Sequence, residues 1–189
     1  MAITRPYAGD STGTGFGYQS GLHVLALSRT ATRGWIRAGS VLMPCALGRG
    51  GRSWRKREGD GATPSGTWLA RQVLYRADRS PRPRTGLSTR PLRPDDGWCD
   101  AVADRNYNRH VRHPYPASAE RLWRSDGVYD VIIVLDHNTR PRVRGAGSAI
   151  FIHLARQNFT PTEGCIALAR RDLMLLLSRM GPRTRISID

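Results

Sequence analysis

The chain has 189 residues, of which 39% are hydrophobic and 24% charged, a composition typical of one globular domain and not of a disordered chain. It contains no run of roughly 18 apolar residues, which a membrane-spanning helix needs, and residues 1–10 lack the apolar centre of a secretory signal. The net charge of +15 favours an anionic partner, either nucleic acid or an acidic cell-wall polymer. Because the arginines are spread along the chain, nucleic acid is the weaker alternative.

Residues 1–20, rich in Gly, Ser and Thr, predict a flexible N-terminal arm ahead of a domain over 21–189. Short apolar runs predict a strand at 22–27 and a strand pair over 35–47 that turns at 38–40. Residues 67–75 predict a further strand, and the β-branched run at 129–135 predicts a buried one. With 20 glycines and 12 prolines, the chain is expected to be mainly β, a sandwich or a mixed sheet, with few helices.

Two segments predict helices. Residues 118–123 suggest a short one. The stronger signal lies near the C-terminus, where apolar residues fall at i, i+3, i+4 and i+7 and Gly181-Pro182 follows as a stop: Leu173, Leu176, Leu177 and Met180. Alternating residues at 185–188 predict the closing strand.

A loop-rich insertion is expected at about 76–126. Residues 76–97 contain four prolines and predict a long loop. Polar and aromatic residues follow it, which suits either a lid that contacts substrate or a packed irregular segment with its own small core: Trp98, Asp100, Tyr107 and Asn108.

Residues 59–66, Gly-Asp-Gly-Ala-Thr-Pro-Ser-Gly, form a dense cluster of turn residues. A phosphate-binding loop would end in Gly-Lys-Ser/Thr and open a helix. Neither feature is present here, so the sequence argues against phosphate binding at this cluster.

A histidine and a cysteine in the last third suggest catalysis. The apolar run 147–153 predicts a strand that ends at His153, and Cys165 directly follows Gly164 in a turn-rich stretch. A base beside a thiol is the minimum apparatus of cysteine acyl transfer. Gly164 would allow close backbone approach, and N–H groups around Cys165 would bind an oxyanion. The alternative is a buried histidine and an inert cysteine.

The remaining cysteines and histidines give weaker signals. Cys45 and Cys99 either pair in an oxidising compartment or serve as two small buried hydrophobic residues. Cys99, His110 and His113 make a conceivable metal set, but their spacing matches no zinc signature.

Over about residues 20–189 the chain resembles the L,D-transpeptidase (YkuD-type) catalytic domain family of bacterial cell-wall enzymes. Residues 59–66 resemble the family's upstream glycine and Thr-Pro-x-Gly segment. His153 together with the run 162–166, Thr-Glu-Gly-Cys-Ile, resembles its His…Ser-x-Gly-Cys signature, with Thr162 in place of serine. The helix and the final strand after the cysteine also fit.

The resemblance implies that Cys165 is a nucleophile, that His153 is the general base and acid, and that the backbone at Gly164 helps to hold the oxyanion. Thr162 and Arg156 would contact substrate. The implied reaction is peptidoglycan cross-linking through a thioester on stem peptides, with no metal or organic cofactor, no nucleic acid partner, and carbapenems as covalent inhibitors. It also implies a location in the cell envelope or periplasm. The alternatives are a carboxypeptidase or endopeptidase on the same peptides, and a non-catalytic basic binding module.

Besides Thr162, four departures from the family pattern point to a divergent branch. Ala167 stands where the family usually has arginine, and Leu154 stands where glycine is common. The loop from His153 to Cys165 is short, and the insertion at 76–126 is long. Three nearby arginines are candidates to replace the missing one: Arg156, Arg170 and Arg171.

Overall fold

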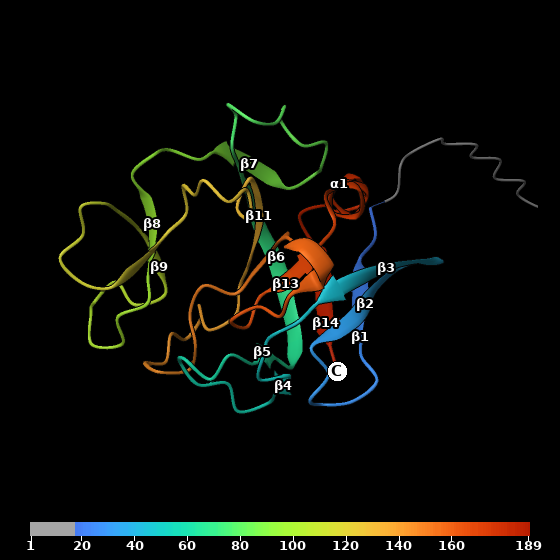
Figure 1. Ribbon diagram of the computed structural model, residues 1–189, viewed down its shortest axis with the longest axis horizontal. Helices are drawn as coiled ribbons and strands as arrows, with labels where there is room; N and C mark the ends of the chain where they lie inside the picture. Colours follow the sequence, from blue (N-terminus) through green and yellow to red (C-terminus); the bar gives the residue numbers. More distant parts are fainter. Residues whose placement is uncertain (1–17) are drawn as a thin grey trace, which may run out of the picture.

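The computed structural model describes residues 18–189 (Figure 1). Most of the predicted N-terminal arm, residues 1–17, lies outside the described residues. The start of the described chain is attached to the domain, because the Gln19 N–H donates to the Arg179 carbonyl at 2.8 Å and the Thr184 hydroxyl donates to the Gln19 carbonyl at 2.8 Å.

A nine-stranded mixed sheet forms the body of the domain, in the order β11-β12-β13-β3-β2-β1-β14-β6-β7. Strand β6 pairs with β14 and also with β11, so the sheet closes on itself. This arrangement confirms the mainly β fold with a mixed sheet. The strands are β1 (Gly21–Leu25), β2 (Arg33–Ala38), β3 (Val41–Ala46), β6 (Gly66–Tyr75), β7 (Ser88–Pro91), β11 (Val131–Leu135), β12 (Phe151–Leu154), β13 (Ile166–Leu168) and β14 (Arg185–Ile188).

The strands predicted from apolar runs are present at their expected places, and β2 and β3 turn where predicted, with Ala38 opposite Val41. The predicted C-terminal helix is α1 (Arg170–Ser178), which buries Leu173, Leu176 and Leu177. A single 3-10 turn, η1 (Gln157–Phe159), is the other helical element within residues 18–189. No helix in this range is long and apolar enough to cross a membrane.

The insertion is more regular than predicted. Residues 118–123 do not form a helix; β10 (Ala119–Arg121) pairs antiparallel with β8 (Asp96–Cys99), which in turn pairs with β9 (Arg109–Arg112). The predicted loop at 76–97 contains β7 and the start of β8. Cross-strand pairing overrides the weak local preference in such short segments, because it satisfies backbone groups that an isolated helical turn leaves open. A further small sheet joins β4 (Arg52–Ser53) to β5 (Thr63–Pro64).

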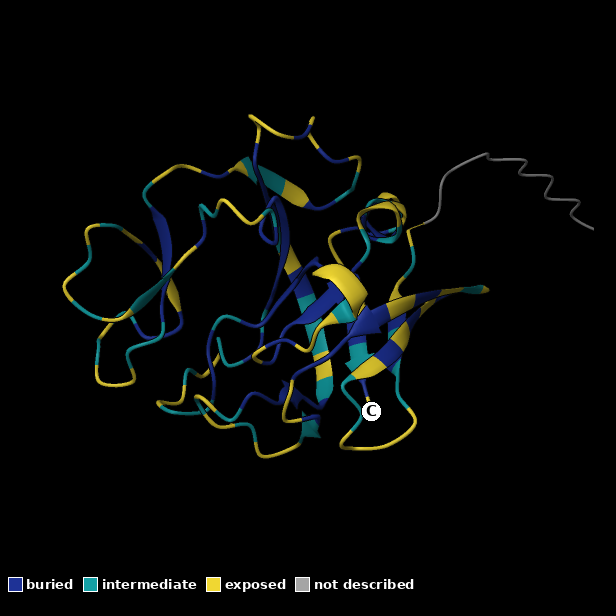
Figure 2. Cartoon of the chain, in the orientation of Figure 1, coloured by how far each residue is buried: buried dark blue, intermediate teal, exposed yellow. Residues whose placement is uncertain are grey.

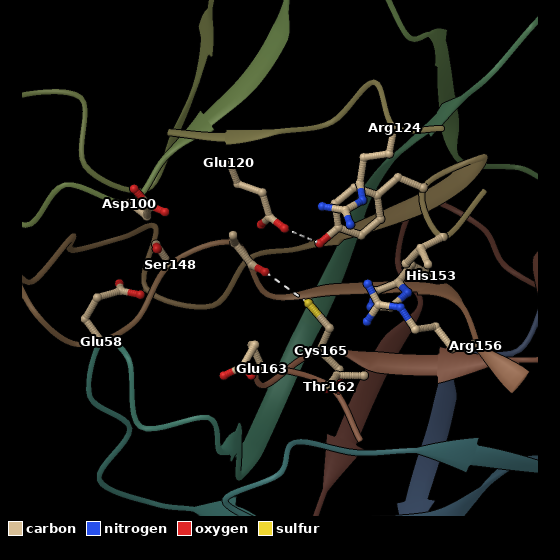
Figure 3. A pocket seen from close by; sticks show the side chains of 13 residues that line it. Glu58, Asp100, Glu120, Arg124, Ser148, His153, Arg156, Thr162, Glu163 and Cys165 are labelled. Atoms are coloured by element: carbon tan, nitrogen blue, oxygen red, sulfur yellow. Dashed lines mark hydrogen bonds between the residues drawn. The ribbon is translucent and has the colours of Figure 1, made fainter. Parts of the chain in front are cut away.

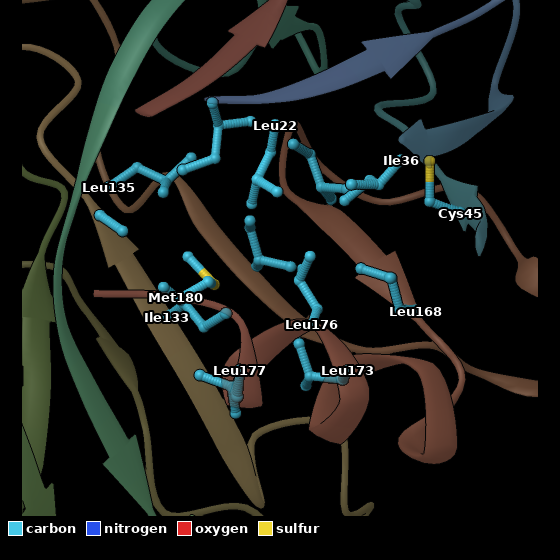
Figure 4. Close-up of a cluster of buried hydrophobic side chains, with 14 of the residues drawn as sticks. Leu22, Ile36, Cys45, Ile133, Leu135, Leu168, Leu173, Leu176, Leu177 and Met180 are labelled. Carbon is cyan, nitrogen blue, oxygen red and sulfur yellow. The ribbon is translucent and has the colours of Figure 1, made fainter. Parts of the chain in front are cut away.

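The interior of the closed sheet holds the larger hydrophobic core (Figure 4). Helix α1 contributes its three buried leucines to it, and Cys45 lies within it. Cys45 and Cys99 are both free and buried, so they act as small buried hydrophobic residues and not as a disulfide. In Figure 2 the buried colour runs through the central strands, while exposed positions concentrate in the loops.

A second hydrophobic cluster lies between the outer face of the sheet and the insertion. Phe151 of β12 and Ile132 of β11 belong to it, together with Trp98 and Leu122 of the insertion. Neighbouring Ile152 belongs to the larger core. Successive residues of a strand point to opposite faces. Therefore His153, two residues after Phe151, faces the insertion and not the interior of the closed sheet.

Asp96 links three segments of the insertion to one another. Its buried carboxylate accepts hydrogen bonds from Arg90 Nη1 at 2.9 Å, the Arg93 N–H at 2.8 Å and His110 Nε2 at 2.6 Å. Burial raises the pKa of Asp96, but these three hydrogen bonds outweigh it, so the pKa lies below its ordinary value. The ionised carboxylate is therefore the form that stabilises the fold.

Replacing Asp96 with alanine is expected to lower the free energy of unfolding by roughly 3 kcal/mol, because it leaves Arg90, His110 and the Arg93 N–H without their shared acceptor. Urea unfolding measures the change. The matched control is Asp95→Asn, since Asp95 is half-exposed and only 3.7 Å from Arg112. Equal effects of the two substitutions would contradict the role given to Asp96.

Candidate active site

Strand pairing brings the histidine and the cysteine to the same face. Strands β12 and β13 run parallel, with His153 opposite Ala167. Cys165 lies two residues before Ala167 and therefore shares its side of the sheet. Figure 3 shows Cys165 and His153 on adjacent segments of this face.

A tight turn presents the cysteine. The Thr162 hydroxyl donates to the Cys165 carbonyl at 2.6 Å and accepts from the Gly164 N–H at 3.2 Å. Gly164 has a φ of +126°, and a Cβ there would lie 2.8 Å from the Ala62 carbonyl oxygen. Only glycine fits both the dihedral angle and the space. Serine, which the resembled signature carries, offers the same hydroxyl that Thr162 uses.

The glycine-rich motif at 59–66 packs against this turn. Ala62 of the motif contacts Gly164 as described, and the Thr63 hydroxyl accepts the Gly48 N–H at 2.8 Å. The backbone of Thr162 is bound to the segment 47–49. Its N–H donates to the Leu47 carbonyl at 2.9 Å, and its carbonyl accepts from the Arg49 N–H at 2.8 Å. The motif thus supports the turn that carries Cys165.

The Cys165 thiol is buried and protonated at rest. Its Sγ donates to the Ala149 carbonyl at 3.2 Å and accepts from the Phe151 N–H at 3.4 Å. Ala149 has a φ of +51°, unusual for a residue other than glycine, and its N–H donates to Asn108 Oδ1 at 3.2 Å. Burial raises the pKa of Cys165 to about 12. The thiol therefore needs a base to become a nucleophile.

His153 is a buried, neutral imidazole. Its Nδ1 lies 2.9 Å from the Leu154 carbonyl oxygen, which can only accept, so Nδ1 carries the proton and Nε2 has the free lone pair. The ring of Tyr129 packs edge-on against the imidazole, with centroids 5.2 Å apart. Burial lowers the pKa of His153 to about 4. At neutral pH the site thus holds a thiol and a neutral imidazole, and not an ion pair.

The depressed pKa of His153 predicts a dependence of stability on pH. The unfolded chain binds a proton near the ordinary histidine pKa of 6.5, whereas the folded protein binds it only near pH 4. Stability from this group is complete above about pH 6.5 and falls as the pH drops toward 4, by on the order of 3 kcal/mol. Urea titrations at several pH values measure it. In His153→Gln the slope in this window should become shallower; an unchanged slope would contradict the assignment.

The thiol and the imidazole open into one cavity of about 410 Å³. In Figure 3 the cavity has two sides around Cys165: Glu58 and Asp100 lie on one side, and His153 and Arg156 on the other. The remaining lining residues are Glu120, Arg124, Val128, Tyr129, Ser148, Ala149, Thr162 and Glu163.

This arrangement, a thiol on a Thr-x-Gly-Cys turn beside a histidine on a parallel strand, fits the match to known families. The L,D-transpeptidase catalytic domain family, YkuD, matches residues 22–188. The chain belongs to the YkuD family. Neither the curated proteins nor the solved structures include one that matches this chain.

Nine site residues were predicted in this YkuD domain. Besides Cys165 and His153, three of them line the cavity: Thr162, Arg156 and Asp100. A further one, Gly164, lies in the turn that carries the cysteine. The other three lie behind its wall. Trp98 Nε1 donates to Asn108 Oδ1 at 2.9 Å, and Tyr107 donates to Glu58 Oε2 at 2.5 Å. Of these four predicted insertion residues, Asp100 borders the cavity, whereas Trp98, Tyr107 and Asn108 are buried behind it.

The position that usually holds arginine in the YkuD family is enclosed in this chain. Ala167 is 1% exposed and lies directly beside His153. Of the three candidate replacements, Arg156 lines the cavity, whereas Arg170 borders a neighbouring hollow and donates to Asp130 at 2.6 Å. Arg171 is exposed on α1.

Several cavity residues were not predicted from the sequence, chiefly Arg124, Glu58, Glu120 and Tyr129. Arg124 and Glu58 lie in loops and carry no motif. Tyr129 is the first residue of the strand predicted at 129–135, so it was interpreted as a core residue and its contact with His153 was not predicted. Cys99, His110 and His113 do not gather into a metal-binding group within residues 18–189, and His110 instead binds Asp96.

Proposed function

We propose that this YkuD-family chain is a peptidoglycan L,D-transpeptidase that forms a thioester on Cys165 and works in the cell envelope. The observation that carries the proposal is the shared cavity, in which a buried thiol lies beside a histidine with a free Nε2 lone pair. Buried groups with strongly shifted pKa values that face one cavity are typical of catalytic sites.

In the proposed acylation, His153 Nε2 takes the proton that the thiol now shares with the Ala149 carbonyl. The thiolate attacks an amide carbonyl of a stem peptide, and His153 then gives the proton to the leaving amine. Backbone N–H groups near Gly164 and Cys165 hold the oxyanion. Because the Gly164 N–H already donates to Thr162, we assign the larger part to the Cys165 N–H.

Arg124 and Arg156 take the place of the arginine that the family usually carries two residues after the cysteine. Both line the cavity, and both pair with Asp126, which holds their guanidinium groups near His153. Stem peptides carry carboxylates, and guanidinium groups bind carboxylates in a fixed geometry. We propose that this pair holds the donor peptide.

The side-chain amine of a diamino acid on a second stem would resolve the thioester and form the cross-link. If water did so, the same site would act as a carboxypeptidase or endopeptidase. A β-lactam of the carbapenem class would acylate Cys165 in place of the donor.

Incubation with purified muropeptides tests the proposal. Cross-linked dimers, separated by liquid chromatography and identified by mass, are the expected products. Shortened monomers without dimers would assign the site to the hydrolases. Unchanged muropeptides would leave only a non-catalytic binding module, and would overturn the proposal.

A further inference from the structure

The active-site cavity is lined by more acidic than basic side chains, although the protein as a whole is basic. The chain has 30 lysines and arginines against 15 aspartates and glutamates, yet four of those 15 acidic residues line this cavity, against two arginines. Glu163 pairs with Arg49 outside it, at 2.8 Å. The other three, Glu58, Asp100 and Glu120, have no ion-pair partner among residues 18–189.

These three carboxylates, here called the acidic wall, are held in place without being neutralised. Tyr107 donates to one oxygen of Glu58 at 2.5 Å, and Tyr129 donates to one oxygen of Glu120 at 2.6 Å. Each tyrosine leaves the second carboxylate oxygen for another donor. Asp100 Oδ1 is enclosed and has no hydrogen-bond partner within the described chain.

Ionised carboxylates in a cavity are costly unless a proton or a cation neutralises them. The two cavity arginines form ion pairs with Asp126 and not with these three carboxylates, although the charge of Arg124 acts to lower the pKa of Glu120. Figure 3 places Glu58 and Asp100 on the opposite side of Cys165 from Arg156, and in this view Glu120 lies between Asp100 and Arg124. The side of the thiol away from Arg156 is therefore suited to a cationic group of the substrate, with Glu58 and Asp100 free of ion pairs there.

We propose that the acidic wall is the binding site for a primary ammonium group, the side-chain amine of the acceptor stem peptide, and that Glu120 receives its proton. The inference rests on the proposed transpeptidase function, which it deepens by naming where the acceptor binds. It divides the cavity into an arginine side for the donor and an acidic side for the acceptor.

The chemistry requires such a base. An ammonium group has no lone pair, so it must lose a proton before its nitrogen attacks the thioester carbonyl. Glu120 takes that first proton. The nitrogen then forms a bond to the carbonyl carbon, the bond from that carbon to Cys165 Sγ breaks, and His153 carries the second nitrogen proton to the leaving thiolate. The products are the new amide, the Cys165 thiol and a protonated Glu120, which returns its proton to water.

The setting of Glu120 suits this role. Burial raises its pKa, against the hydrogen bond from Tyr129, which lowers it. A carboxylate with a raised pKa is a stronger base than an exposed one. The same Tyr129 packs against His153, so one side chain positions both proton acceptors of the site.

The test separates the two half-reactions in Glu120→Gln and Asp100→Asn. Acylation is followed by intact mass with a carbapenem, and cross-linking is followed with a purified tetrapeptide donor and increasing amounts of a diamino-acid stem peptide. We expect both variants to be acylated at nearly the wild-type rate. In both variants the acceptor concentration for half-maximal cross-linking should rise by about tenfold or more, since a charge-assisted contact is lost. In Glu120→Gln the cross-linking rate at saturating acceptor should also fall, since the proton acceptor is lost.

Asp95→Asn, in the same insertion but outside the cavity, is the control and should cross-link as the wild type does. An acceptor whose side-chain amine is acetylated should give no dimers with any variant. If Glu120→Gln and Asp100→Asn both keep the wild-type acceptor dependence, the acidic wall is not the ammonium site, although the transpeptidase function stands. If the wild type is acylated by the donor and yields only shortened monomers, the acceptor site and the cross-linking function fall together.

Discussion

Cys165→Ala is expected to abolish covalent modification by a carbapenem and to reduce cross-linking of muropeptides by about 10⁴-fold or more, because no other group in the cavity can form the thioester. Intact-mass measurement of the protein after treatment gives the first result, and dimer yield gives the second. The substitution removes one sulfur atom from a buried site, so the fold is expected to survive, which circular dichroism verifies.

The other two cysteines provide matched controls. Cys45 lies in the core of the closed sheet and Cys99 lies in β8, both buried and free. Cys45→Ala and Cys99→Ala should each keep a single adduct on the protein. An adduct that persists in Cys165→Ala and disappears in either control would transfer the nucleophile to another position and overturn the mechanism.

His153→Gln is expected to slow acylation by about 10² to 10⁴-fold, the usual contribution of a general base. The effect should be large here because burial raises the pKa of the thiol to about 12, so little thiolate forms without help. The rate of carbapenem adduct formation measures it. In the wild type that rate should fall as the pH drops toward 4, where His153 gains its proton and loses the lone pair.

His23→Gln is the control for this substitution, because His23 lies in β1 and does not line the cavity. It should react at the wild-type rate. A His153→Gln variant that keeps more than about one tenth of that rate would show that another group removes the thiol proton, since a general base contributes at least 10²-fold.

The elements with strong local signals could be predicted from the sequence. The β-branched run at 131–135 is a buried strand, and the leucines of α1 repeat at helical spacing. The insertion could not be predicted as well. Residues 119–121 form a strand only because β8 lies alongside, a pairing between residues far apart in the chain, such as Glu120 with Trp98.

The same division applies to the site. His153 and the turn at Cys165 lie in a short motif whose glycine and hydroxyl have local physical reasons, so the sequence identifies them. Glu120 and Arg124 reach the cavity only after the insertion has folded onto the outer face of the sheet. No spacing along the chain encodes that contact, which is why these residues escaped prediction.

The enclosed thiol has a consequence for survival in an oxidising environment. Peroxides and disulfides react with the thiolate form of cysteine. Burial raises the pKa of Cys165 to about 12, so at pH 7 it forms far less thiolate than an exposed cysteine does. The hydrogen bond to the Ala149 carbonyl holds the proton on sulfur. The buried thiol is therefore expected to resist oxidation better than an exposed cysteine, without a disulfide partner.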